Sequence, residues 1–275
     1  MKRFSLLFLI LLVPLIPACT PVPEQFTPLE HRVIEATNVK SIRIQIDNGN
    51  LRILESTDSF VRVNGQVLFP DTLEYQVGSS GKQLTLLLMS HQDRSSKTPL
   101  EVSIEVPEQM QVKVETGKAS VWVREYHGDV EVDSTSGNVT IEQAEGALTL
   151  YSNRGNITVR DCSGKISVVG NYGTLTLQDT SGEMAASTIM GNIFLEGKIQ
   201  SGDTTRLEAD HGAVSVDLKA DSALELHARS TSGDVTCLIS GMTSTTRSCD
   251  GIMNSGGGSL SIRTVSGAVT LQLIP

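Results

Sequence analysis

Two aspartates have the spacing best suited to chemistry in this sequence. Asp161 and Asp179 are eighteen residues apart, so a chain that coils with that period would place their carboxylates about 5 Å apart on neighbouring coils. Such a pair can hold Ca²⁺ or act as acid and base on a glycosidic bond. No lysine or arginine stacks with them within the regular coils of residues 117–196, and aspartate is also favoured in turns. We keep both as weak metal candidates and expect no catalytic residue and no cofactor.

The other reactive side chains form no known catalytic pattern. The sequence has no phosphate-binding glycine–lysine loop, no His-Glu-x-x-His and no Cys-x-x-Cys. His127, His211 and His227 are isolated, and we expect them in surface turns. Trp122 lies between two valines of an alternating segment, so it should point outward. There it would either cover the side of the fold or offer a stacking surface for a sugar ring.

Composition excludes two broad classes of protein. The 275 residues carry a formal net charge of −9, with a sequence pI near 5.1, which excludes a generally basic nucleic-acid binder. Only 4% of the residues are aromatic, and 24 are glycine. Many small and β-branched residues with few aromatics argue against a helical bundle and favour β-structure.

The N-terminus has the pattern of an export signal. Lys2 and Arg3 precede an apolar run over residues 4–15, and small residues follow before Cys19. The run is too short to span a membrane. Residues 1–18 resemble a bacterial lipoprotein signal peptide, which implies that Cys19 is acylated and becomes the first residue. The alternative is an ordinary secretory signal cut near Ala18, with Cys19 an incidental thiol.

The lipoprotein interpretation sets location and partners. A diacylated cysteine supplies stable attachment to a membrane, and no other apolar stretch is long enough to span one. Residues 19–30 contain three prolines and are expected to form an extended tether. We expect an exported protein anchored to the cell membrane or outer membrane. Thr20, rather than Asp, after the cysteine favours the outer membrane where the cell has one.

Three further cysteines are Cys162, Cys237 and Cys249. Export permits disulfides, and Cys237 and Cys249 are close enough in sequence to pair, which leaves one thiol over. Cys237 is equally well explained as a small buried apolar residue. Metal binding is disfavoured because no histidine lies near these cysteines in sequence.

Glycines recur at a fixed interval of nine residues. Every interval in one run is nine, at positions 128, 137, 146, 155, 164, 173, 182 and 191. The second and fourth residues after each glycine are apolar, and those between are mostly polar. This alternation predicts short strands with one buried face. Glycine at each strand entry would permit the positive φ of a tight turn.

Similar residues recur every eighteen positions, so they form columns when the sequence is written in rows of eighteen. This indicates that one coil contains two strands. Asn138, Asn156 and Asn192 share a column, and Ser134 and Ser152 share another. Such repeats bury their apolar residues only by stacking. We expect inward Val, Ile and Leu columns and shared side-chain amide hydrogen bonds between Asn138 and Asn156.

The alternation extends beyond the regular coils of residues 117–196. We predict an all-β protein, a single-stranded β-solenoid over residues 31–275 that is more irregular near its N-terminus. Residues 240–258, which contain Cys249 and three consecutive glycines, are expected to be a protruding loop insertion. Residues 269–275 would be an exposed last coil. An alternative is a small β-sandwich at 31–115 followed by the solenoid.

These segments resemble the bacterial putative-adhesin family. The resemblance rests on 139–141, 157–159 and 175–177 between Ser-Gly turns, on the strand-Pro-strand-Gly step of 102–117, and on the closing repeat at 260–271. It implies a solenoid at the cell envelope, of unknown biochemical activity and without catalytic residues to transfer.

Three functions follow from this resemblance and the anchor. The first is a non-catalytic surface interaction or adhesion module, for which a rigid rod with a polar Thr/Ser/Asn face suits multivalent binding. The second is an envelope-stress or assembly accessory that binds a partner protein. The third, less favoured, is a β-helix that binds or cleaves polysaccharide. The expected partners are the membrane and an unknown protein or surface glycan.

The anchor predicts a defined effect of removing the thiol. Cys19→Ala is expected to abolish incorporation of labelled lipid and to release the protein from the membrane fraction, because two acyl chains provide the attachment. Metabolic labelling and cell fractionation measure both. A Cys19→Ala protein that stayed fully in the membrane fraction would contradict the lipoprotein interpretation.

Overall fold

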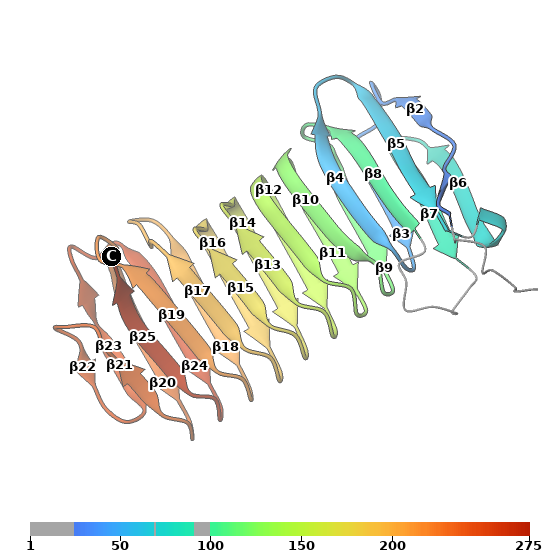
Figure 1. The fold of residues 1–275 in the computed structure, drawn as a ribbon. Coiled ribbons are helices and arrows are strands. Elements are labelled where there is room, and N and C mark those ends of the chain that lie inside the picture. The colour runs from blue at the N-terminus through green and yellow to red at the C-terminus, as the bar shows by residue number, and fades with distance from the viewer. Residues whose placement is uncertain (1–24, 69, 91–99) are drawn as a thin grey trace, which may run out of the picture.

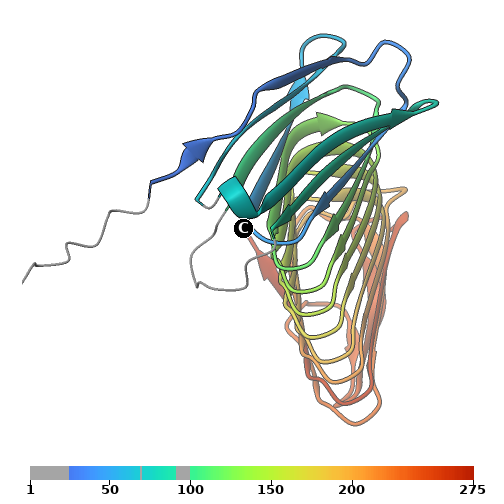
Figure 2. The same cartoon turned by 90° about the vertical axis from the view of Figure 1, so that its right-hand side faces the viewer.

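The protein is an elongated stack of β-coils. The computed structural model describes residues 25–68, 70–90 and 100–275. The lipidation candidate Cys19 and the signal at 1–18 lie outside these residues. Figure 1 shows the strands side by side along one axis, and Figure 2 shows the coils nested nearly end-on. Among the described residues, no helix is long and apolar enough to cross a membrane.

Each regular coil has two strands on opposite sides of a narrow core. We call the two sides face A and face B. Face A contains β11 (Val130–Ser134), the second half of β12 (Val139–Ser152), β14 (Ser163–Gly170), β16 (Ser181–Thr188) and β18 (Thr204–Ala209). Face B contains β10 (Ser120–His127), the first half of β12, β13 (Ile157–Arg160), β15 (Leu175–Gln178), β17 (Ile193–Gly197) and β19 (Val214–Lys219).

The register confirms the eighteen-residue coil. Neighbouring strands are parallel, and Thr140 pairs with Thr158, which pairs with Thr176. Inward rows such as Val139, Ile157, Leu175 and Ile193 are fully buried. The spacing rises to 21 where Met184 pairs with Thr205, because residues 198–203 form an additional turn between β17 and β18.

The N-terminal end is a continuation of the solenoid. Strands β3 (Ser41–Ile46) and β4 (Asn50–Ser56) pair in parallel with β9 (Gln111–Thr116) and β10 on one side. On the other side they pair with β7 (Gln83–Ser90) and β8 (Leu100–Pro107). The alternative of a separate β-sandwich at 31–115 is therefore wrong, because the first coil in sequence lies inside the stack.

Antiparallel strands cover this end. The segment β6 (Leu73–Ser80) pairs with β7, and β5 (Phe60–Val67) pairs with β8. A 3₁₀ turn, η1 (Pro70–Thr72), precedes β6. The strands β1 (Thr27–Pro28) and β2 (Arg32–Glu35) pair with β5. Residues 27–30 of the expected tether thus belong to the folded domain, since Leu29 also packs against the core.

The C-terminal end reverses the order of its coils. The last coil, β24 (Gly258–Thr264) and β25 (Val269–Ile274), lies between β18/β19 and the preceding coil, β20 (Leu224–Ser230) and β21 (Val235–Cys237). Residues 269–275 are therefore not the exposed end of the stack. β25 pairs with β19 along its whole length and with β21 over Val269–Leu271.

The segment 240–258 is not a protruding loop. It contains β22 (Thr243–Ser244) and β23 (Ser248–Met253), and β23 pairs antiparallel with β20 over six residues. Cys249 and Met253 on this strand are buried. The glycines at 256–258 follow this strand. Because consecutive glycines are typical of loops, the sequence pattern concealed the strand β23, which covers β20.

The two corners of a coil use glycine for different reasons. From face B to face A, Gly164 has φ of +117°, the conformation expected from the sequence. From face A to face B, Gly155 and Gly173 do not have positive φ. A Cβ at Gly155 would lie 1.9 Å from the Gly137 carbonyl oxygen, and one at Gly173 would lie 2.0 Å from the Gly155 oxygen. Here close stacking of turns requires glycine, so the positive-φ explanation was wrong for this corner.

Side chains complete the hydrogen bonding of the turns. Buried Ser152 and Thr188 accept the N–H groups of Gly155 and Gly191, each at 2.9 Å. Asn138 Oδ1 accepts the backbone N–H of Asn156 on the next coil at 3.0 Å. The asparagine column therefore bonds to backbone rather than through the expected amide–amide contacts.

Stacked turns predict a large cost for one added methyl group. Gly173→Ala is expected to lower the free energy of unfolding by about 1–3 kcal/mol, because its Cβ must push two coils apart. Gly78→Ala is the matched control, since a Cβ there meets nothing within 4 Å, and its effect should be below about 0.5 kcal/mol. Urea unfolding measures both. Equal stability of the two variants would contradict the stacking argument.

Candidate interaction surfaces

Asp161 and Asp179 occupy the corner from face B to face A on successive coils. Both have left-handed backbone, with φ of +51° and +48°, and Glu125 and Gln143 share this conformation eighteen residues apart. Aspartate tolerates this conformation better than most residues. The Asp179 carboxylate accepts a hydrogen bond from Lys219 Nζ at 2.6 Å. The described residues hold no group of three His, Cys, Asp or Glu that could bind a metal.

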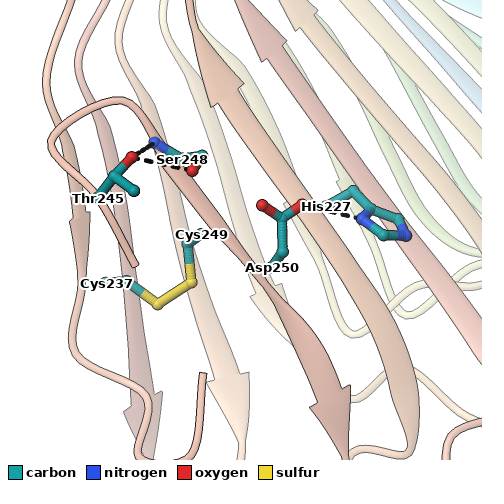
Figure 3. Close-up of a disulfide and its surroundings, with 6 residues drawn as sticks. All are labelled: His227, Cys237, Thr245, Ser248, Cys249 and Asp250. Carbon is teal, nitrogen blue, oxygen red and sulfur yellow. Dashed lines mark hydrogen bonds and ion pairs between the residues drawn. A yellow bond between two sulfur atoms is a disulfide. The ribbon is translucent and has the colours of Figure 1, made fainter. Parts of the chain in front are cut away.

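A disulfide joins the two faces at the C-terminal end. Cys237 on β21 and Cys249 on β23 are bonded, with Cα atoms 6.1 Å apart (Figure 3). The bond closes the core where the stack ends. Cys162 is free and buried, and burial raises the pKa of its thiol.

The three histidines singled out in the sequence bond to acidic side chains or a hydroxyl. His127 Nδ1 lies 2.9 Å from Glu55, which raises the pKa of His127. His127 is the last residue of β10 and His227 lies within β20, so neither is in a turn as expected. The Nδ1 atom of His227 is 3.0 Å from Asp250 on the cap strand (Figure 3), and this bond raises the His227 pKa. The sequence did not predict either contact, because each one joins strands at an end of the stack, where the eighteen-residue repeat does not hold. His211 is in a turn and bonds Ser266.

A straight row of side chains runs along the outside of face B. In register it comprises Ser103, Arg52, Trp122, Thr140, Thr158, Thr176 and Phe194. We call this the threonine row. Its members repeat at about 4.8 Å, and the three threonines alternate with buried neighbours on their strands. The row therefore presents evenly spaced hydroxyl groups on a flat surface.

Aromatic rings lie at both ends of the three threonines. Trp122 lies on the outer surface between the Arg52 and Arg124 guanidinium carbons, which are 5.4 and 5.9 Å from its ring centroid. Its indole N–H donates to Glu142 at 3.1 Å. Phe194 is 45% exposed. Trp122 thus both covers the side of the fold and remains at the surface, while Phe194 offers an open ring.

A polar hollow extends the row beyond Trp122. It has a volume of about 290 Å³ and is lined by Arg52, Asn64, Gln66, Glu101 and Ser103, among others. Amides, a hydroxyl, a carboxylate and a guanidinium supply hydrogen-bond donors and acceptors in one concave surface. The sequence did not reveal it, since β4, β5 and β8 meet only in the folded end.

An apolar ridge lies along face A of the regular coils and the turns that lead from face A to face B. It consists of Tyr151, Val169, Tyr172, Ile189 and Met190, all exposed and on three consecutive coils. Contiguous exposed apolar groups mark contact sites more often than scattered ones. Writing the sequence in rows of eighteen reveals part of it, because Tyr151 aligns with Val169 and Tyr172 with Met190.

A protein-family model described as Toastrack DUF4097 matches residues 36–272. The chain belongs to the Toastrack family. This confirms the resemblance to bacterial putative adhesins and the solenoid expected from it. No curated protein matches the chain.

Solved structures of similar fold include two bacterial proteins. A putative adhesin from Bacteroides fragilis NCTC 9343 is 14% identical, with a TM-score of 0.53, covering 91% of this chain and 99% of its own. A putative adhesin from Parabacteroides merdae ATCC 43184 is 12% identical, with a TM-score of 0.47, covering 89% and 95%. At 14% identity the likeness to the Bacteroides fragilis protein establishes the fold alone.

The disulfide predicts a measurable stabilisation of the C-terminal end. Its loop spans 12 residues, so reduction should lower the free energy of unfolding by up to about 3 kcal/mol through the entropy of the unfolded chain. Urea unfolding with and without reductant measures this difference. The Cys237→Ala/Cys249→Ala variant is the control, and reductant should leave it unchanged. A wild type insensitive to reductant would contradict the pairing.

Proposed function

We propose that this Toastrack protein is a lipid-anchored, non-catalytic envelope protein whose face B binds a surface glycan. The threonine row carries the proposal, because its evenly spaced hydroxyls suit a polymer that repeats polar groups. Phe194 and the polar hollow beyond Trp122 supply a stacking surface and further hydrogen bonds. Cys19 would hold the rod at the membrane, and many weak contacts along it would add up.

Two further observations support a binding role over a reaction. The candidate carboxylates Asp161 and Asp179 are explained by their left-handed turns and, for Asp179, by Lys219. The similar solved proteins are described as putative adhesins. A chain of this family that displays a flat polar surface fits a surface interaction module.

A second candidate is an envelope accessory that binds a partner protein. The apolar ridge favours it, because Tyr172 and Met190 are each 58% exposed, and burial of such groups drives protein association. The ridge and the threonine row lie on different surfaces, so substitutions can separate the two candidates.

Substitutions on the two faces test the glycan proposal. Thr158→Glu is expected to weaken binding to immobilised bacterial and host surface glycans by about tenfold, because it interrupts the hydroxyl row with a charge. Thr149→Glu is the matched control, since Thr149 points outward from face A. Glycan-array binding and retention of the anchored protein on cells are the measurements.

The same glycan-binding assay can also contradict the proposal. Equal glycan binding by Thr158→Glu and Thr149→Glu would overturn the glycan proposal. Loss of cell retention in Tyr172→Ser alone would then support the accessory role.

A further inference from the structure

A second hollow lies on face A near the C-terminal end. It has a volume of about 420 Å³ and is formed by β20 and β24. Its polar lining includes His227, Arg229, Thr231, Ser261 and Arg263. Figure 1 shows these strands side by side close to the C-terminus, away from the N-terminal cap. The chemistry of the lining is cationic, although the chain as a whole carries −9.

Two arginines stand directly opposite each other in this hollow. Arg229 and Arg263 are register partners on neighbouring parallel strands, which places their Cα atoms about 4.8 Å apart. Like charges in this position are destabilising. Arg229 is 3.1 Å from Asp250. Arg263 forms no salt bridge with any residue that the structure describes, so its charge is available to a ligand.

The carboxylates around the hollow are paired with cations other than Arg263. Glu208 is the register partner of Arg263 on the other side, but its carboxylate pairs with Arg206 at 2.6 Å. Asp250 is shared between Arg229 and His227. Glu225 also pairs with His227, at 3.2 Å. Each of these three carboxylates is therefore engaged by another cation, and the Thr231 and Ser261 hydroxyls add neutral donors beside Arg263. This combination matches an oxyanion with several acceptor oxygens.

We propose that the hollow of Arg229 and Arg263 binds a phosphate group. Two guanidiniums can each direct a fork of N–H donors at one tetrahedral oxyanion, and the charge of a phosphate would offset their mutual repulsion. In the envelope such a group comes from a lipid headgroup or from a soluble or polymer-bound phosphate. The site lies on face A, so it is independent of the glycan surface on face B.

Titration with pyrophosphate tests the site directly. Isothermal titration of the purified protein is expected to show binding that weakens with salt. Arg263→Gln should weaken it by about tenfold or more, the range of a charge-assisted hydrogen bond. Arg160→Gln is the matched control, because Arg160 is on face B and pairs with Glu142 at 3.7 Å. Arg263→Lys keeps the charge but loses the fork, so an intermediate affinity is expected.

Vesicle-binding experiments distinguish the source of the phosphate, and folding measurements serve as controls for the variants. Binding to vesicles of phosphatidic acid, but not of phosphatidylcholine, that Arg263→Gln abolishes would assign a lipid headgroup; pyrophosphate binding without vesicle binding would assign a soluble or polymer-bound phosphate. Circular dichroism and urea unfolding establish that each variant is folded. Wild-type protein that does not bind pyrophosphate, or equal affinities of Arg263→Gln and Arg160→Gln, would overturn the proposal. Thr158→Glu should leave pyrophosphate binding unchanged, so the two sites fail separately.

Discussion

Hydrogen bonds between parallel strands hold successive coils about 4.8 Å apart, and each turn must keep that distance. At the corner from face A to face B, the glycines at 137, 155, 173 and 191 allow it, because the carbonyl oxygen of the turn below each one occupies the space of a Cβ. The stacked turns keep the strands in register, and the register aligns inward Val, Ile and Leu into a continuous core. The same register aligns the outward residues, so the threonine row and the apolar ridge follow from coil stacking.

A stack of parallel coils has two open ends, and in this protein the strands at both ends are arranged in the same way. At each end a terminal coil in sequence is placed one position inside the stack, and antiparallel strands cover the outermost coil. This arrangement protects the first and last coils from fraying and interrupts the parallel edge on which another copy could continue the sheet. The disulfide adds a covalent link between the two faces at the C-terminal end. Antiparallel strands therefore cover both ends, although β6 pairs only with β7 among the described strands. The lateral faces offer the longer surfaces for partners.

The sequence predicted what is local and periodic. Alternation and the eighteen-residue columns identified the strands, the inward rows and the family, because each regular coil contacts the next one in sequence. The sequence did not predict contacts between coils that are neighbours in space but not consecutive in the chain. The insertion of 258–274 before 224–237 in space leaves no periodic signal, so the last coil was taken for an edge and β23 for a loop. The first coil was compatible with a sandwich for the same reason. Cys19 lies outside the described residues and remains a prediction.

The coil exchange at the C-terminal end also has a chemical consequence. In a stack built in simple sequence order, the coil of Arg229 would follow that of Glu208, and the two would form an ordinary cross-strand ion pair. Insertion of the last coil places Arg263 between them instead. The repulsion between Arg229 and Arg263 is then a cost that the fold's topology creates and that side-chain pairing within the chain only partly offsets. A bound anion would remove this cost, so its affinity would depend on the same exchange that closes the stack.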